Sequence, residues 1–258
     1  MHLQSTTFMT FSPGGKTKTI METVARHCQC RSFSVNLLPH QDPLRRQFES
    51  EELLVTGFPV YSGRMPSPLV KRLAYIKGNR SPAVVIATYG NHFYGDALLE
   101  MADFLSSRGF VVIGGAAFIG RHAVFPDIAE DRPNASDLKR AFAFAQALEA
   151  KINRLDHPDN GAVLLPGHHP YQKAKRFPAV PTSTKDCRIC GVCAINCPVQ
   201  AIPWDAPDKT DRDKCIACTT CIVHCPYHCR QFKKRDLFLI HKKAVKTTRV
   251  ILSPETWL

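Results

Sequence analysis

The chain has 258 residues, of which 44% are hydrophobic and 22% charged, and a formal net charge of +12. These values predict an ordinary globular protein of two domains. No apolar run reaches the roughly 18 residues of a membrane helix. Residues 2–7 lack the basic and apolar segments of a signal peptide, so we expect a cytoplasmic protein without a transmembrane segment. The basic balance fits an acidic partner or an anionic surface. No nucleic-acid motif accompanies the scattered Lys and Arg, so we expect no nucleic-acid binding.

The first 155 residues alternate short apolar runs with helical patterns, as βαβ units around a parallel sheet do. The predicted strands are 5–11, 33–38, 53–60, 83–88 and 110–113, and the predicted helices are 17–26, 69–77, 96–107 and 136–153. Five strands with intervening helices predict an α/β fold with a doubly wound, five-stranded parallel sheet. Such sheets bind ligands beyond the carboxyl ends of their strands. The loops after the first, third and fourth strands are therefore the candidate binding loops.

The loop after the first strand, residues 12–17, has the composition of a phosphate site. Glycines let the backbone approach an anion, and the free amides at a helix start point toward it. Ser12 and Thr17 add hydroxyl groups, and Lys16 adds a positive charge. A Walker A loop would need a glycine where Thr10 stands, and the chain has no G-x-G-x-x-G sequence. The ATPase and dinucleotide interpretations are therefore disfavoured.

The other two loops carry aromatic residues: Tyr61 follows the third strand, and residues 89–94 follow the fourth. A flat aromatic cofactor binds against aromatic faces. A phosphate loop combined with two aromatic loops favours flavin mononucleotide (FMN) over a nucleoside triphosphate.

Eight of the eleven cysteines form two runs with the pattern C-x2-C-x2-C-x3-C-P, at residues 187–198 and 215–226. In this pattern the fourth cysteine of each run binds the other [4Fe–4S] cluster. The predicted set for cluster 1 is Cys187, Cys190, Cys193 and Cys225, and the set for cluster 2 is Cys215, Cys218, Cys221 and Cys197. Structural zinc is the main alternative, since paired C-x2-C motifs also bind zinc. Disulfides suit small secreted chains better than this one.

The segments 11–17, 57–66 and 89–100, together with the two cysteine runs, resemble flavodoxins fused to a bacterial-type ferredoxin with two [4Fe–4S] clusters. The resemblance extends to about residue 230. It implies a flavodoxin-like sheet followed by a small α+β ferredoxin domain. It also implies an FMN phosphate site and an isoalloxazine border. The implied phosphate residues are Ser12, Pro13, Gly14, Gly15, Lys16 and Thr17, and the implied ring residues are Tyr61, Ser62, Gly63, Thr88, Tyr89, Gly90, Asn91 and Tyr94.

One departure from the family concerns Gly14, which stands where the phosphate loop usually has a hydroxyl residue before its glycine. This departure removes one hydrogen-bond donor. Cys28 and Cys30 are predicted to be free thiols, and Cys229 a buried thiol outside the eight ligands.

The predicted domain order is a flavin-binding domain at 1–155, a linker at 156–180, a ferredoxin-like domain at 181–231 and a basic tail at 232–258. We expect an electron-transfer protein that relays electrons between FMN, two [4Fe–4S] clusters and an acidic redox partner. No catalytic residue is identified. Two alternatives stay open. One is an FMN-dependent reductase of quinone or nitro substrates fed by the clusters, and the other is an iron–sulfur sensor or carrier with a flavodoxin-like scaffold.

Overall fold

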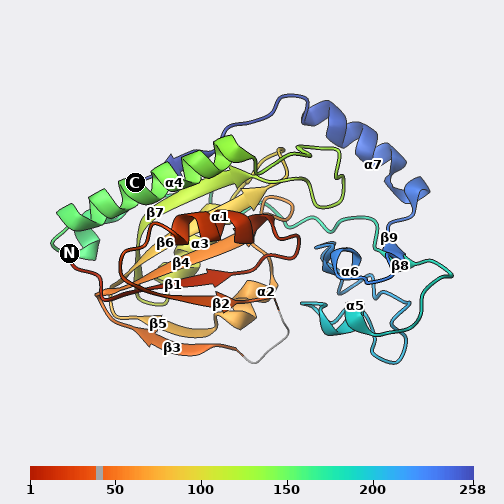
Figure 1. Cartoon of the computed structure of the whole chain (residues 1–258), viewed down its shortest axis with the longest axis horizontal. Helices are drawn as coiled ribbons and strands as arrows, with labels where there is room; N and C mark the ends of the chain where they lie inside the picture. The colour runs from red at the N-terminus through yellow and green to blue at the C-terminus, as the bar shows by residue number, and fades with distance from the viewer. Residues whose placement is uncertain (39–42) are drawn as a thin grey trace.

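The computed structural model describes residues 1–38 and 43–258 (Figure 1). Its main sheet has the strand order β10-β7-β6-β4-β1-β2. The strands are β1 (Ser5–Thr10), β2 (Arg31–Asn36), β4 (Glu52–Pro59), β6 (Ser81–Tyr89), β7 (Phe110–Ile119) and β10 (Glu255–Trp257). All the pairings are parallel except that of β10 with β7. Without β10, the order along the sheet is that of a flavodoxin-like fold. The predicted doubly wound α/β class is confirmed.

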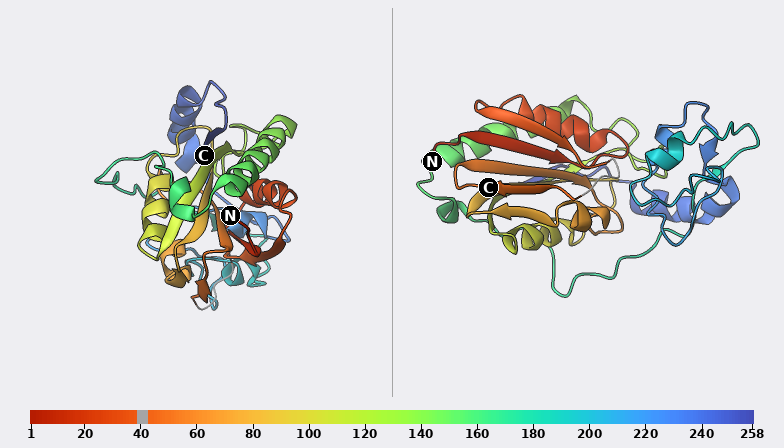
Figure 2. Two further views of the ribbon diagram at one scale, coloured as in Figure 1. Left: turned by 90° about the vertical axis from the view of Figure 1, so that its left-hand side faces the viewer. Right: turned by 90° about the horizontal axis from the view of Figure 1, so that it is seen from below.

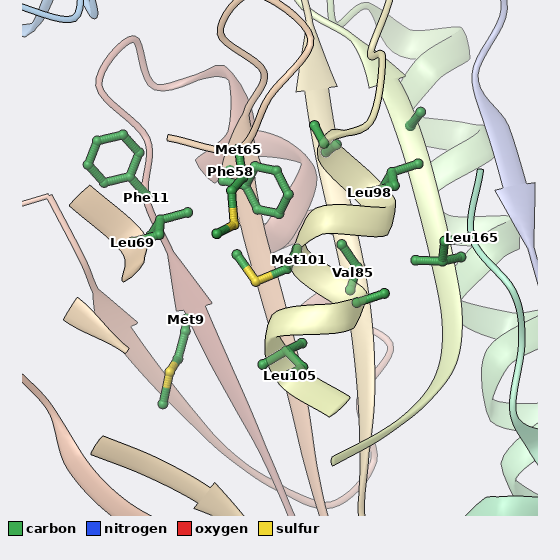
Figure 3. Packing of buried hydrophobic residues seen from close by; sticks show 14 of the residues in the cluster. Met9, Phe11, Phe58, Met65, Leu69, Val85, Leu98, Met101, Leu105 and Leu165 are labelled. Carbon is green, nitrogen blue, oxygen red and sulfur yellow. The ribbon is translucent and has the colours of Figure 1, made fainter. Parts of the chain in front are cut away.

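Helices cover both faces of this sheet, as the fully buried strand β6 requires. Helices α1 (Lys16–Ala25) and α4 (Ala135–Arg154) pack on one face, and α2 (Pro68–Arg72) and α3 (Ala97–Ser106) pack on the other (Figure 2). Figure 3 shows Leu98, Met101 and Leu105 of α3 beside Val85 of β6. This two-sided core holds the strand ends, and therefore the candidate binding loops, in fixed positions.

The sheet has six strands, so the predicted count of five is wrong. The sixth strand, β10, comes from the C-terminal tail, where no strand was predicted. It pairs with β7 so that Trp257 lies opposite Gly115. Glycine permits this approach, because a Cβ atom on the neighbouring Gly114 would lie 2.9 Å from the Leu258 side chain. A strand of three residues is too short to show the alternation on which sequence-based prediction depends.

The structure corrects the bounds of two other predicted elements, one helix and one strand. The predicted helix at 69–77 ends at Arg72, and β5 (Tyr75–Gly78) follows, paired in parallel with β3 (Arg45–Phe48) in a small second sheet. Strand β7 continues through residues 114–119, beyond the predicted strand end at residue 113. A Cβ atom on Gly115 would lie 2.5 Å from the side chain of Leu165 in the linker. Glycine at this position therefore makes room for Leu165 to pack against β7.

The cysteine-rich part contains two short helices and a two-stranded antiparallel sheet. The helices are α5 (Val192–Ile195) and α6 (Thr220–Val223), and the strands are β8 (Thr182–Ser183) and β9 (Arg230–Gln231), after the 3-10 helix η1 (Pro158–Gly161). The two cysteine runs have positive φ at corresponding positions: 54° at Ile189 and 52° at Ala217, then 74° at Gly191 and 64° at Thr219. The runs therefore repeat in backbone conformation as well as in sequence.

After β9 the chain forms α7 (Lys234–Thr247) and then returns to the main sheet as β10. Figures 1 and 2 show the cysteine-rich part beside one end of this sheet, with α7 near both. Leu237 of α7 packs against the main core and against a small cluster that includes Ala217 and Phe232. Over the residues that the structure describes, no helix is long and apolar enough to cross a membrane.

Candidate cofactor sites

A large cavity of about 1280 Å³ lies at the carboxyl ends of the parallel strands, between the sheet and the cysteine-rich part. Ligand pockets usually measure about 300–1,000 Å³, so this one has room for a cofactor and more. Ten of the fourteen residues predicted to bind FMN line it: Pro13, Gly14, Lys16, Thr17, Tyr61, Ser62, Gly63, Thr88, Tyr89 and Gly90. Ser12, Gly15, Asn91 and Tyr94 do not. The structure therefore brings the three predicted loops together.

The first loop leaves open space beside its glycines. A Cβ atom on Gly14 or Gly15 would meet nothing within 4 Å, and Gly15 has a φ of 80° that favours glycine. Helix α1 begins directly after it, and its first N–H groups have no intrahelical acceptors. The Ser12 Oγ accepts a hydrogen bond from the Lys18 N–H at 3.0 Å, so it caps the helix. The main anion-binding groups available at this loop are thus backbone amides and the Lys16 ammonium.

The second loop is a two-residue turn. Tyr61 and Arg64 exchange backbone N–H···O bonds of 3.0 and 3.1 Å, and Ser62 and Gly63 both have positive φ. Such a turn requires positive φ at both central residues. Tyr61 is partly buried at its edge. Burial raises the pKa of Tyr61 well above its ordinary value, and an electrostatic interaction with Cys218 acts in the same direction. Tyr61 therefore lies close to both the large cavity and the second cysteine run.

The third loop combines an aromatic residue with a close backbone contact. The Tyr89 hydroxyl is buried and has no hydrogen-bond partner within the described part of the chain. Burial raises the pKa of Tyr89 to about 12, so the hydroxyl stays protonated. A Cβ atom on Gly90 would lie 2.7 Å from the His122 side chain, which packs directly on this glycine. Thr88 and Thr17 share a buried hydrogen bond of 2.6 Å between their hydroxyls, which ties this loop to the first.

Asn91 and Tyr94 contact the C-terminal tail. The Asn91 side chain, 1% exposed, donates to the Thr248 and Val250 carbonyls at 3.0 Å and accepts from the Leu252 N–H at 2.8 Å. The Tyr94 hydroxyl donates to the Glu255 carboxylate at 3.1 Å. Nothing in the local sequence around these two residues indicates partners so distant in the chain.

His122 lines the large cavity but is not among the residues predicted to bind FMN. Its Nδ1 accepts hydrogen bonds from the Val124 and Phe125 N–H groups at 3.2 and 3.1 Å. Burial lowers the pKa of His122 to about 4. The ring is therefore neutral near pH 7 and carries its proton on Nε2. Its place beyond the carboxyl end of a parallel strand, where such sheets bind ligands, was the one signal that could have identified it.

The linker forms one wall of the cavity through residues 172–177. Asp96, 4% exposed, accepts hydrogen bonds from the His168 and Gln172 N–H groups at 2.9 and 2.7 Å. Arg64 donates to the Gln172 carbonyl at 2.7 Å and pairs with Glu100. Neither Arg64 nor Asp96 is among the predicted site residues. They instead fix the linker against the loop that carries Tyr61.

The eight motif cysteines surround two small cavities in the cysteine-rich part. One is lined by Cys187, Cys190, Cys193 and Cys225, and the other by Cys197, Cys215, Cys218 and Cys221. Each cavity thus gathers three cysteines from one run and the last cysteine of the other, as in the predicted ligand sets, and Cys229 also lines the first cavity. All are free thiols. Their binding of [4Fe–4S] clusters stays a prediction.

The arrangement of these thiols differs from that of a single-ion site. Among the described residues, no three His, Cys, Asp or Glu side chains are gathered closely enough to hold one metal ion. A zinc site would bring four ligands to within about 2.3 Å of one point. Four cysteines at each cavity are compatible with an iron–sulfur cluster, whose usual ligands are four cysteine thiolates.

Backbone amides point at several of the sulfur atoms. Cys197 accepts from the Ala201 N–H, and Cys225 accepts from the Cys229 N–H, each at 3.2 Å. Burial alone would raise the pKa of Cys225, but amide hydrogen bonds, led by that of Cys229, lower it overall. Burial raises the pKa of Cys221 to about 11 and that of Cys218 to about 12. Metal coordination would be needed to hold these two as thiolates at neutral pH. Cys229 itself is buried, as predicted.

The two cysteine sets differ in their distance from the large cavity. Cys215 and Cys218 of the second set line that cavity as well as their own. No member of the first set lines it, and Cys190 of that set is exposed. A chain of aromatic rings joins the two parts, with Phe177 lying 6.2 Å from Phe125 and 5.9 Å from Phe232 between ring centroids.

Searches against protein-family models and against curated proteins give no match. Several solved structures resemble part of the chain. A flavodoxin from the domain Archaea has 13% identity and a TM-score of 0.41, over 58% of this chain and 99% of that one. Oxidised flavodoxin 2 from Bacillus cereus has 14% identity and a TM-score of 0.41, over 57% and 99%. The azoreductase AzrA has 13% identity and a TM-score of 0.39, over 55% and 99%. The assignment of a flavodoxin-like fold depends on the strand order given above.

Proposed function

We propose that this protein is an electron carrier that relays electrons between an FMN in the large cavity and two [4Fe–4S] clusters on the two cysteine sets, and on to a redox partner. One observation carries the proposal: the large cavity at the strand ends and the second cysteine cavity share Cys215 and Cys218 in their walls. A cofactor in each would lie within one side chain of the other.

The residues around the large cavity fit FMN. The open glycine loop, the start of α1 and Lys16 suit the phosphate. Tyr61 and Tyr89 offer aromatic surfaces for a flat ring, and the unpartnered Tyr89 hydroxyl offers a hydrogen bond. His122 adds a neutral Nε2–H donor. When bound, FMN supplies one- and two-electron chemistry, and each cluster supplies one-electron transfer. The protein binds these groups, orients them and sets their separation.

The unequal placement of the cysteine sets supports an order for the relay. The second set lies next to the flavin cavity, and the first set lies farther away with Cys190 exposed. We therefore assign the order as flavin, second cluster, first cluster and partner. The net charge of +12 favours an acidic partner, because complementary charge speeds the encounter.

The test is an anaerobic preparation in which flavin and iron are quantified and both are titrated with a reductant. We expect one FMN and about eight irons per chain. We also expect Cys218→Ser to slow flavin reoxidation through the clusters more than Cys190→Ser does. Clusters without flavin would favour the sensor or carrier interpretation. Neither flavin nor iron after reconstitution would refute the proposal.

A second candidate, an FMN-dependent reductase, is favoured by the size of the cavity. At about 1280 Å³ it exceeds the usual size of a pocket for one ligand, which leaves space for a quinone or nitro substrate beside the flavin. Steady-state turnover of such a substrate distinguishes the two functions. A reductase shows saturation and loses rate in His122→Gln, whereas a carrier reduces small acceptors slowly and without saturation.

A further inference from the structure

Arg230 is a buried cation without a counter-ion. Its residue is 2% exposed, and the oxygen atoms to which its guanidinium donates are all neutral. Nη1 donates to the Pro207 and Asp208 carbonyls at 3.2 and 3.0 Å, and Nη2 donates to the Pro181 carbonyl at 3.1 Å and to the Thr210 hydroxyl. No carboxylate in the described part of the chain forms an ion pair with it. A buried, unpaired charge is costly, so an anion is expected nearby.

One N–H group of Arg230 also lacks an acceptor. Nε is buried and has no hydrogen-bond partner within the described residues. Buried donors are nearly always satisfied. The guanidinium therefore misses both a negative charge and a hydrogen-bond acceptor.

The guanidinium lies between the two cysteine cavities. Arg230 lines the first cavity, and its Nη1 shares the Pro207 carbonyl with the Cys193 thiol, which reaches it at 3.3 Å. On the other side, Pro181 and Thr210 accept from Nη2 and line the second cavity. The guanidinium group therefore lies at the wall of the first cavity and bonds to residues that line the second.

We propose that Arg230 is the shared counter-charge of both [4Fe–4S] clusters and raises both reduction potentials. A cluster gains negative charge when it is reduced, and a buried cation stabilises that charge more than one in water would. Cluster potentials respond to net charge and to hydrogen bonds at sulfur, and Arg230 supplies both. This inference rests on the proposed clusters and is independent of FMN.

The test compares three full-length variants in an anaerobic titration followed by electron paramagnetic resonance. Arg230→Met is expected to lower both potentials by at least 59 mV, a tenfold change in a one-electron equilibrium constant. Arg230→Lys keeps the positive charge and should change the one-electron equilibrium constant of each cluster less than threefold. The matched control is Arg188→Met, because Arg188 also lines the first cavity but is exposed over the Tyr227 ring. Unchanged potentials in Arg230→Met, or a shift of one cluster only, would overturn the proposal.

A second measurement tests the proposal if Arg230→Met does not assemble its clusters. Wild-type protein labelled with ¹⁵N-arginine is reduced, and the ¹⁵N hyperfine coupling to the clusters is recorded by pulsed magnetic resonance. We expect a coupling that disappears in Arg230→Lys. Absence of any arginine coupling in wild type that contains about eight irons would refute the role of Arg230. A wild type without iron would instead refute the proposed function.

Discussion

Asn91 fixes the C-terminal tail to the loop after β6, and its replacement should release that tail. Its amide makes three hydrogen bonds, to the carbonyls of Thr248 and Val250 and from the N–H of Leu252. A typical hydrogen bond contributes about 0.5–1.5 kcal/mol, so Asn91→Gly should cost about 1.5–4.5 kcal/mol of tail-anchoring free energy. Asn91 has a φ of 58°. Asn91→Ala should therefore cost about 1–2 kcal/mol more, because alanine resists the left-handed conformation.

Hydrogen exchange measured by mass spectrometry gives the free energy of local opening. We expect faster exchange in residues 248–257 of both variants, more in Asn91→Ala, with little change in β1 and β4. The matched control is Asn79→Ala, because Asn79 makes an exposed hydrogen bond to Glu49 on another part of the surface. Unchanged tail protection would contradict the reasoning. A large loss of FMN affinity with the tail still protected would show that Asn91 borders the flavin instead.

Three further predictions address the two sites. Because burial lowers the pKa of His122 from 6.5 to about 4, the unfolded chain binds a proton first as the pH falls, so stability should drop between about pH 6.5 and 4, by up to about 3 kcal/mol. Urea unfolding at several pH values measures this slope, which should flatten in His122→Gln; an equal slope would contradict the assignment. Gly14→Ser has free space for its side chain, so the added hydroxyl should lower the Kd for FMN several-fold in a fluorescence titration, and weaker binding would argue against a phosphate at this loop. Cys197→Ser should abolish the cluster on the second cysteine set in magnetic-resonance spectra, and loss of the first-set cluster instead would refute the crossed grouping.

The sequence allowed prediction of the parts of the fold that depend on local pattern. The apolar, β-branched run at 83–88 marked the central strand, and the glycines and hydroxyl residues at 12–17 marked the loop that opens α1. The cysteine spacing predicted two ligand sets of four, and the members of each set line a separate cavity, with Cys229 also at the first. In each of these cases, the determining residues lie next to one another in the chain.

The features that were missed depend on contacts between distant residues. The predicted strand ended at residue 113, before Gly114 and Gly115, which admit Leu258 and Leu165 beside β7. Asp96 begins a predicted helix, and no local pattern indicates that the distant linker supplies two amides to its carboxylate. Arg230 had no visible role, because neither its burial nor its position between the cavities can be read from a single Arg after a cysteine.

The return of the chain as β10 changes how the two halves of the molecule are connected. The cysteine-rich part leaves the sheet through the linker and rejoins it through α7 and β10, so it is an insertion between two segments of one sheet. Two attachments restrict hinge and twist motions that a single tether would permit. A protease cut within 164–180 would therefore leave both fragments associated. Exchange of this cysteine-rich part between proteins would require grafting at two junctions, one in the linker and one before β10.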